Sequence, residues 1–230
     1  MYNTGQKLIA EFMGTFALLF FGVGSICAAL KAGPSGPTPG LLGIAIAHGL
    51  GIGLSVAAVG HISGGHFNPA VSAAFWVTRR LSTMDLVLYW VAQLVGATVA
   101  SWLITCFYLE DVWRRALSAI ALAPEVTPVV GMAIEAAITF LLVFVIFGTA
   151  VDKNSAFGGL APFAIGLTIT ADILTAGLLT GAAINPARAF GPAVVGHFWS
   201  NQLVYWVGPL AGGIAGGCLY HFLLMRKSQS

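Results

Sequence analysis

The chain has 230 residues, of which 58% are hydrophobic and only 8% are charged. About a quarter of the residues in a soluble domain are charged, so this composition excludes an ordinary soluble protein and predicts a helical integral membrane protein. The formal net charge of +2 is too small and too dispersed for a nucleic-acid-binding surface. The three cysteines lie in apolar stretches and indicate neither a disulfide framework nor a metal site.

Six apolar runs are each long enough to cross a bilayer as a helix. We expect membrane spans at about 8–30, 41–60, 86–108, 129–151, 159–180 and 203–225. The first run is too long for the core of a signal peptide, so it is interpreted as a retained span. The longest connection, 110–128, is expected to be a plain loop.

Basic residues predict the orientation of the spans. With the N-terminus inside, six lie on the inner side: Lys7, Arg79, Arg80, Lys153, Arg226 and Lys227. Three lie on the outer side: Lys31, Arg114 and Arg115. Because cytoplasmic loops are enriched in Lys and Arg, both termini are expected in the cytoplasm. The short flanks without a transit segment favour a bacterial inner membrane.

Two segments, 63–70 and 180–187, share the pattern [Ser/Thr]-Gly-x-x-apolar-Asn-Pro-Ala. Asn is a favoured N-cap and Pro is tolerated at the first helical position, so each segment predicts the start of a short helix, ending near Val77 and Val195. A helix start presents unpaired N–H groups and a partial positive charge. The motif residues are Asn68, Pro69, Ala70, Asn185, Pro186 and Ala187.

The two motifs belong to an internal repeat. At nearly the same offset, Leu88-Tyr89-Trp90-Val91 matches Val204-Tyr205-Trp206-Val207, and Glu11 matches Glu135. We therefore expect one domain over 1–230, built from repeats at 1–108 and 129–230. Three spans per repeat invert the second repeat, which places the functional site at the midplane.

The motif segments have irregular backbone between apolar flanks. Such backbone is tolerated at membrane depth only where it is buried in protein or lines a watery cavity. Two half-helices entering from opposite faces would meet at their N-termini, with Asn68 and Asn185 side by side. A water molecule that accepts from both amides would point its hydrogens outward and break a proton wire. The carbonyls of 64–67 and 181–184 are expected to supply acceptors along the path.

The duplicated Asn-Pro-Ala, Glu11-x-x-Gly14-Thr15-Phe16 and Asn-Pro-Ala-Arg188 resemble the aquaporin (major intrinsic protein) family over essentially the whole chain. The resemblance implies an all-α membrane protein with six transmembrane helices, two re-entrant half-helices and an inverted 3+3 repeat. It implies a homotetramer in the lipid bilayer, with a passive water pore in each subunit that excludes protons and ions and needs no cofactor. It also implies that Glu11 and Glu135 hold the re-entrant loops through their backbone groups.

The family's spacing assigns a selectivity filter to Arg188, His48, Ile173 and Ala182. Strict water channels usually have Phe in the second span and His in the fifth, whereas this quartet is similar to that of plant tonoplast intrinsic proteins. Ala and Ile leave a wider constriction than an aromatic pair. We therefore expect water to pass together with small neutral solutes such as ammonia, urea or hydrogen peroxide.

Three alternatives stay open. A glycerol or small-polyol facilitator usually has Asp where this chain has Ala189, and the Tyr205-Trp206 pair is typical of the water branch. A coupled secondary transporter would need intramembrane charges, for which Glu11 and Glu135 are the candidates. A structural, junction-forming membrane protein would show negligible flux. No nucleophile–base pair, phosphate loop or paired carboxylates indicate an enzyme.

A few residues lie outside this scheme. His66 is expected in the cytoplasmic vestibule and His61 in a loop contact, with a pH gate as the alternative reading. Asp172, beside Ile173, either lines the outer vestibule or pairs locally. Arg114 and Arg115 are expected to be solvated loop charges rather than groups at the pore mouth. Glycine pairs such as Gly49-x-x-x-Gly53 and Gly212-x-x-x-Gly216 are expected to permit close helix crossings within the subunit.

Overall fold

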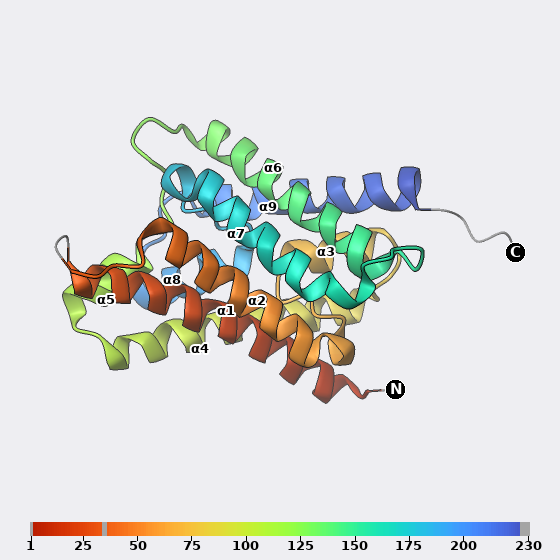
Figure 1. Ribbon diagram of the computed structural model, residues 1–230, viewed down its shortest axis with the longest axis horizontal. Helices are drawn as coiled ribbons and strands as arrows, with labels where there is room; N and C mark the ends of the chain where they lie inside the picture. Colours follow the sequence, from red (N-terminus) through yellow and green to blue (C-terminus); the bar gives the residue numbers. More distant parts are fainter. Residues whose placement is uncertain (1, 34–35, 226–230) are drawn as a thin grey trace, which may run out of the picture.

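A computed structural model describes residues 2–33 and 36–225. Within these ranges all regular structure is helical, and six helices are long and apolar enough to cross a membrane (Figure 1). They cover Thr4–Ala32, Gly40–Ser63, Thr83–Phe107, Pro128–Val151, Gly158–Thr180 and Gln202–Leu224. The six predicted spans are therefore confirmed, and each predicted end lies close to the observed one.

The principal spanning helices are α1 (Thr4–Ala32), α2 (Gly40–Ser63), α4 (Thr83–Phe107), α6 (Pro128–Ile146), α7 (Ala161–Thr180) and α9 (Gln202–Leu219). The shorter helices are α3 (Pro69–Val77), α5 (Glu110–Leu117) and α8 (Pro186–Gly196). Single turns η1 (Phe147–Val151), η2 (Gly158–Leu160) and η3 (Tyr220–Leu224) extend α6, precede α7 and extend α9.

The long helices run along the long axis, and α1 begins at the same end at which η3 finishes (Figure 1). α1 packs against α2 and α4, α6 packs against α9 and α7, and α2 packs against α7. The short helices α3 and α8 lie toward opposite ends of the molecule, as half-helices entering from opposite faces would (Figure 1). The all-α fold with six spans and two short helices is confirmed, while the repeat bounds at 1–108 and 129–230 stay a prediction.

Glycines set the closest helix crossings. A Cβ on Gly166 of α7 would lie 2.6 Å from the carbonyl oxygen of Gly49 on α2, and one on Gly212 of α9 would overlap the Ala136 backbone of α6. A Cβ on Gly213 would lie 3.1 Å from the Ala70 carbonyl oxygen, at the start of α3. The predicted use of these glycines within the subunit is confirmed, because only a hydrogen side chain admits such backbone approach.

Two elements differ from the predictions. α1 begins earlier than expected because Asn3 and Gln6 form a reciprocal capping box. The connection expected to be a plain loop contains α5. That helix has Glu110 and Asp111 in its first turn and Arg114 and Arg115 in its last, which complements the helix dipole. Eight residues are too few to show a helical period in sequence.

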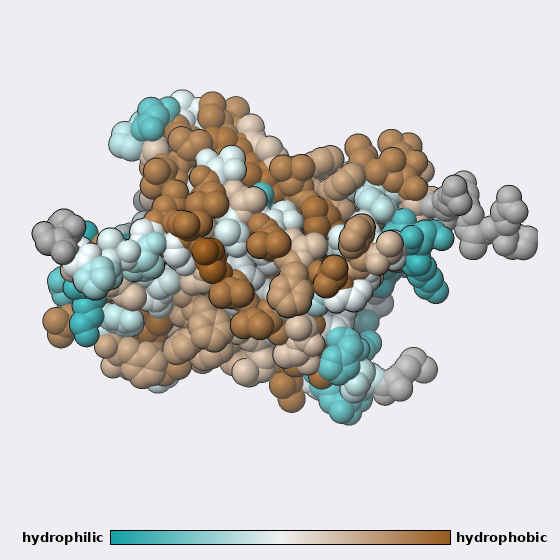
Figure 2. Space-filling view, viewed as in Figure 1, coloured by the Kyte–Doolittle hydropathy of each residue, from teal (hydrophilic) through white to brown (hydrophobic). Residues whose placement is uncertain are grey.

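The surface fits a bilayer environment. Apolar residues cover the middle of the molecule and polar residues gather toward its two ends (Figure 2). Large side chains such as Leu109 and Leu178 are each 77% exposed, which would be a liability in water. Arg226 and Lys227, which contribute to the predicted orientation, lie outside the described residues.

Candidate pore and constriction

Two loops bring α3 and α8 into the interior. α2 and α7 each end at a left-handed glycine, Gly64 with φ 98° and Gly181 with φ 78°. After each of these glycines the chain turns back, and a new helix starts at an Asn-Pro pair. The Oδ1 of Asn68 accepts from the Ala70 N–H at 2.8 Å, and the Oδ1 of Asn185 accepts from the Ala187 N–H at 2.9 Å. Both asparagines are N-caps, as their sequence pattern predicts.

The two loops are joined directly through these asparagines. The Asn68 amide donates to the Ile184 carbonyl at 3.1 Å, and the Asn185 amide donates to the Phe67 carbonyl at 2.9 Å. Both asparagines are only 3% exposed. The crossed bonds hold the N-termini of α3 and α8 against each other at one point.

The accepting carbonyls belong to strained residues. Phe67 has φ 51° and Ile184 has φ 62°, in the left-handed region that costs a non-glycine residue about 1–3 kcal/mol. Thr15 donates to the Phe67 carbonyl at 3.1 Å, and Thr139 donates to the Ile184 carbonyl at 3.3 Å. The strain is therefore held by groups from α1 and α6 as well as by the asparagines.

Glu11 of α1 anchors the first loop. Its Oε1 accepts from the Ser63 hydroxyl at 2.7 Å and the His66 N–H at 3.0 Å. Its Oε2 accepts from the Phe67 N–H and the Gln93 amide, both at 2.7 Å. Every partner is a donor, so the buried carboxylate acts only as an acceptor. This is the arrangement that the family resemblance implies for Glu11.

Glu135 of α6 anchors the second loop in the same way. Its Oε1 accepts from the Thr180 hydroxyl at 2.7 Å and the Ala183 N–H at 2.8 Å, and its Oε2 accepts from the Ile184 N–H at 2.7 Å. Both glutamates are fully buried. Each loop is therefore held by hydrogen bonds to one carboxylate, which comes from the first helix of its half.

Sequence reasoning missed several supports of the loops. The Tyr89 hydroxyl donates to the Ser63 carbonyl at 2.7 Å, and the Tyr205 hydroxyl donates to the Thr180 carbonyl at 3.0 Å. The signal was present, because Tyr89 and Tyr205 occupy matching positions of the repeat. Gln93 was missed because no residue at its matching position shares its chemistry.

A narrow cavity of about 20 Å³ lies between the loops, which is room for about one water molecule. Its polar wall includes Asn68, Asn185 and Arg188. The aliphatic wall comprises Leu18, Ile52, Val71, Leu142, Ile146, Ile165, Ile169, Ile173, Ala183 and Ile184. A cavity lined by a few hydrogen-bond donors among aliphatic side chains can orient a small polar molecule without binding it tightly.

Arg188 is held rigidly beside this cavity. Its Nη1 donates to the carbonyls of Gly181 at 3.0 Å and Ala182 at 2.7 Å, and its Nη2 lies 3.2 Å from the Nε2 of His48. Ile173 lines the same cavity as Arg188. Of the predicted filter, His48 and Ala182 thus contact the guanidinium of Arg188, and Ile173 shares a cavity with it.

The hydrogen bonds also fix the state of His48. Its Nδ1 lies 2.8 Å from the Ile44 carbonyl, which can only accept, so the proton is on Nδ1. Its Nε2 then accepts from Arg188, which can only donate. The imidazole is neutral in this arrangement, and the fixed positive charge of the site is that of Arg188.

Four of the eight carbonyls expected to supply acceptors along the path accept hydrogen bonds from the protein itself. Of the carbonyls at 64–67 and 181–184, those of Phe67 and Ile184 accept from the opposing asparagines. Those of Gly181 and Ala182 accept from Arg188. The carbonyls of Phe67 and Ile184 each accept a second bond, from Thr15 and Thr139, whereas no second bond uses the other lone pair of Gly181 or Ala182 among the described residues, so the row of acceptors along the path stays a prediction.

The two histidines that flank the first motif, His66 and His61, lie in different environments. His66 is 5% exposed, lines the cavity, and its Nδ1 lies 3.1 Å from the Ser72 hydroxyl. His61 is exposed and packs edge-on against Tyr2, with ring centroids 5.7 Å apart. Within the part of the chain that the structure describes, no three His, Cys, Asp or Glu side chains are grouped to hold a metal ion.

The other charged candidates lie away from the cavity. Asp172 is 4% exposed, does not line the cavity, and its Oδ2 has no partner among the described residues. Arg114 donates to Glu110 at 2.7 Å and stacks on the Trp113 ring at 5.0 Å. Arg115 is exposed. Arg114 is thus engaged within α5 rather than at the constriction.

The sequence resembles those of known proteins over nearly its whole length. A family model described as Major intrinsic protein matches residues 2–220. Aquaporin TIP2-1 of Arabidopsis thaliana is 41% identical, with 97% of this chain and 89% of that protein covered. Aquaporin TIP4-4 of Zea mays is 41% identical, with 96% and 88% covered. Aquaporin-8 of Mus musculus is also 41% identical, with 95% and 82% covered.

The fold matches a solved structure. The X-ray structure of the aquaglyceroporin from Plasmodium falciparum superposes with a TM-score of 0.84 at 23% identity, covering 96% of this chain and 97% of that one. The relatives named above come from plants and a mammal, so they give no support to the bacterial inner membrane expected from the sequence. The chain belongs to the major intrinsic protein family, whose members are multi-pass membrane channels for water or small solutes rather than enzymes.

Proposed function

We propose that the protein is a passive water channel that excludes protons and ions, and that its filter also admits small neutral solutes such as ammonia, urea or hydrogen peroxide. The observation that carries this proposal is the crossed pair of asparagine amides beside the fixed guanidinium of Arg188. We propose one channel domain over residues 1–230.

Proton exclusion rests on the chemistry of the amide pair. Each Oδ1 of Asn68 and Asn185 is used in capping, and one N–H of each amide is used in the crossed bond. The second N–H of each amide is left for a permeant, so the centre offers donors only. A water molecule there accepts twice and points its hydrogens away on both sides. The positive ends of α3 and α8 add a barrier to cations at the same point.

The filter proposal rests on His48, Ile173, Ala182 and Arg188. Arg188 repels cations and donates to a passing molecule, while the neutral His48 adds no second charge. Ile173 and Ala182 are smaller and less rigid than an aromatic pair, which favours a wider constriction. A dedicated glycerol facilitator is disfavoured by Ala189.

The coupled-transporter alternative is disfavoured by the contacts of the two intramembrane acids. Both oxygens of Glu11 and of Glu135 accept hydrogen bonds from their loops. A carboxylate that couples ion movement must release its hydrogen-bond partners in each transport cycle. Here that release would break the hydrogen bonds that hold a loop in place. These acids support a fixed pore better than a moving one.

We further propose a homotetramer with both termini in the cytoplasm. The orientation rests on the excess of Lys and Arg on one side of the spans. It makes the first loop enter from the cytoplasm and puts the Arg188 constriction on the outer side, with His66 in the inner vestibule.

Stopped-flow light scattering on proteoliposomes tests the function. We expect osmotic shrinkage faster than in empty vesicles, no increase in proton leak reported by an internal pH dye, and uptake of at least one of ammonia, urea and hydrogen peroxide. An Asn154→Ala variant, in an exposed loop, serves as a handling control. Water flux no faster than in empty vesicles would sink the proposal, and passage of water alone would refute the wide filter.

A further inference from the structure

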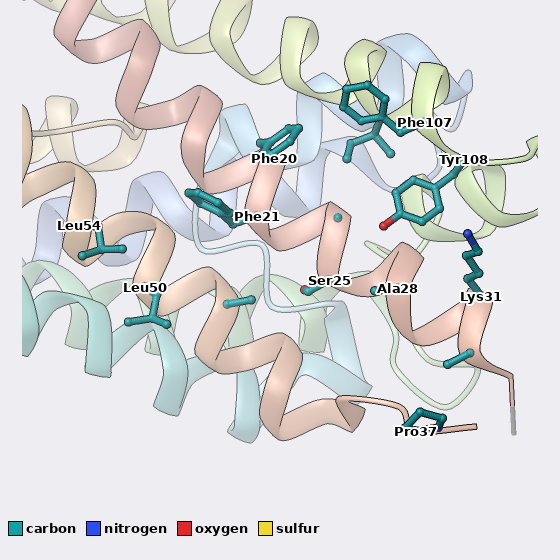
Figure 3. Close-up of a pocket in the computed structure, with 14 residues that line it drawn as sticks. Phe20, Phe21, Ser25, Ala28, Lys31, Pro37, Leu50, Leu54, Phe107 and Tyr108 are labelled. Atoms are coloured by element: carbon teal, nitrogen blue, oxygen red, sulfur yellow. The ribbon is translucent and has the colours of Figure 1, made fainter. Parts of the chain in front are cut away.

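Two hollows of the molecule differ in their chemistry. An outer groove of about 980 Å³ lies between α1, α2 and the end of α4, and mainly apolar side chains such as Phe20, Phe21 and Leu50 line it (Figure 3). The central cavity, by contrast, is lined by the imidazole of His66, to which the proposed function gives no chemical role. The protonation state of this ring follows from the polar groups behind it.

The His66 ring is held in one orientation. Its centroid lies 4.2 Å from that of Phe75 and 5.3 Å from that of Tyr89. Its Nδ1 lies 3.1 Å from the hydroxyl oxygen of Ser72, whereas its Nε2 has no hydrogen-bond partner among the described residues. The ring therefore turns Nδ1 to the protein and leaves Nε2 for a molecule in the cavity.

Glu11 sets the orientation of the Gln93 amide. Both carboxylate oxygens of Glu11 accept from backbone N–H groups, so this site takes only donors. The amide nitrogen of Gln93 donates to it at 2.7 Å, because an amide oxygen at that place would be repelled by the carboxylate. The Oε1 of Gln93 has no partner in the described part of the chain, so no other contact dictates this orientation.

The amide in turn sets the direction of the Ser72 hydroxyl. The second hydrogen on Nε2 of Gln93 points to the Ser72 oxygen, 3.0 Å away, so that oxygen accepts. Ser72 is completely buried, and a buried hydroxyl hydrogen without an acceptor is costly. Within residues 2–33 and 36–225, the other hydrogen-bond partner of this hydroxyl is the Nδ1 of His66. Ser72 therefore donates to Nδ1, which carries no proton.

We propose that Gln93 and Ser72 are positioning residues that fix His66 in the neutral form protonated at Nε2, so that the ring offers the cavity a donor and no acceptor. A neutral imidazole has one N–H, and the hydrogen bond at one nitrogen decides which nitrogen carries it. The inference rests on the proposed function, since this donor matters only if a permeant passes the ring. A water molecule beside His66 then accepts from it and keeps both hydrogens for the neighbouring waters.

Gln93 and Ser72 also have a simpler reading, in which they only tie α4 to α3 and to the first loop. That reading predicts that substitutions lower stability without moving the proton of the ring. The proton is sensitive to its neighbours elsewhere in this protein, because at His48 the Ile44 carbonyl, which only accepts, keeps it on Nδ1. The two readings therefore differ in the tautomer of His66 in variants of Gln93.

Solid-state NMR of nitrogen-labelled histidine in proteoliposomes tests the proposal, because protonated and bare ring nitrogens resonate far apart. A His66→Gln variant identifies the signals of this ring by their loss. In the wild type we expect a protonated Nε2 and a bare Nδ1. Gln93→Glu should invert the pattern. The new carboxyl has at most one hydrogen, which goes to Glu11, so it accepts from Ser72, and Ser72 must then accept from an Nδ1–H.

The matched control is Gln6→Glu, the same change at an exposed position that keeps its capping oxygen. It should leave the ring proton and the water flux unchanged. Gln93→Glu should lower water flux about fivefold, the effect of one hydrogen bond, because the ring then presents an acceptor. Gln93→Met removes the amide donor without adding a charge, and it should show both forms of the ring side by side even if the first variant does not fold.

The proposal is overturned if wild-type His66 carries its proton on Nδ1, or if the Gln93 variants keep the wild-type pattern. It is also overturned if the ring inverts in Gln93→Glu without any fall in water flux, because the donor then does not act on the permeant. Wild-type vesicles with the expected ring proton but no water flux would refute the proposed function and leave the assignment of the tautomer intact.

Discussion

The loop after α2 and the loop after α7 share one hydrogen-bonded frame. In each loop, a hydroxyl and two backbone N–H groups donate to a buried glutamate. A threonine and the asparagine of the other loop donate to one strained carbonyl, and a tyrosine donates to the carbonyl at the end of the preceding helix. The donors to Glu11 and Glu135 lie at distances between 2.7 and 3.0 Å in both loops. The backbone of the two loops is therefore set by nearly the same contacts.

The chemistry added to the frame differs. In the first loop, Gln93 donates to Glu11 and, at 3.0 Å, to the Ser72 hydroxyl, so α4 is tied to both the loop and α3. The matching positions of the second half hold Pro209 and Ala189, which can make no such bonds. There, the position that matches Val71 is Arg188. The first loop therefore has additional polar support from Gln93, and the second has the positive charge of Arg188.

The comparison separates two tasks. Contacts that appear in both halves set the position of the asparagines, which both sides of the pore need. Of the contacts that appear in one half, those of Gln93 add support to the first loop, whereas we expect those of Arg188 to set selectivity, which is needed once along the path. Substitutions in the shared frame should damage folding, whereas substitution of Arg188 should change which solutes pass.

The largest effect is expected from Glu135→Gln. The new amide group sets a donor against the donors of the second loop and leaves buried N–H groups unpaired, at a cost of about 3 kcal/mol. Glu11→Gln should cost less, because the Oε1 of Gln93 has no partner and the Gln93 amide can rotate to accept from the new group. We expect a clearly larger drop in Tm, and a larger loss of folded yield, for Glu135→Gln.

Thermal unfolding in detergent measures this difference. Glu110→Gln, which breaks the exposed pair with Arg114, is the control and should change Tm little. Equal losses for Glu11→Gln and Glu135→Gln would show that Gln93 gives the first loop no alternative partner.

The second prediction exchanges Arg188 for its counterpart in the other half. Arg188→Val removes the fixed charge and the donor to His48, while the Asn185 cap and the Glu135 anchor remain. Urea uptake and cation leak should each rise about tenfold, since the charge barrier is lost. Arg115→Val, at an exposed position of α5, is the matched control. Unchanged leak in the Arg188 variant would contradict the role proposed for the guanidinium.

The third prediction moves a filter residue without replacing it. A Cβ on Gly22 would overlap the His48 ring, whereas a Cβ on Gly24 would lie 3.6 Å from the Ile104 Cδ1, an ordinary contact. Gly22→Ala should displace His48 into the path and lower water flux several-fold. Gly24→Ala, on the same helix, should leave it near wild type. Similar fluxes in the two variants would mean that the His48 position does not limit the pore.

Sequence patterns predict the helices and the paired motifs better than they predict the hydrogen bonds that join them. The apolar runs predicted the six spans, and the repeated motif predicted that Asn68 and Asn185 meet. The crossed bonds between the loops were not predictable, because they depend on the left-handed φ of Phe67 and Ile184, which neither residue type favours. The part played by Gln93 was hidden because its partners, Glu11 and Ser72, are distant in sequence. The filter quartet came from family spacing, and only the structure supplies the bonds that Arg188 makes.

The smallest effect on water flux is expected where only the filter residues change and both loop frames stay intact. Replacing His48 with Phe and Ile173 with His puts an aromatic ring at each of these two filter positions, the pattern usual in strict water channels. Urea and ammonia uptake should fall about tenfold, whereas water flux should stay within about twofold, because the amide pair and both glutamate anchors are untouched.

The two single variants show how much each substitution contributes to the fall in urea and ammonia uptake. Ile173→His alone should restrict urea more than ammonia, because it narrows the cavity wall on which Ile173 lies. His48→Phe alone removes the acceptor at 3.2 Å from the Nη2 of Arg188, so it also tests whether that bond fixes the guanidinium. If the double variant passes urea as fast as the wild type, the width of the path is set elsewhere. The nearest alternative is then the aliphatic wall of Ile165 and Ile169, which lie two turns and one turn along α7 from Ile173, respectively.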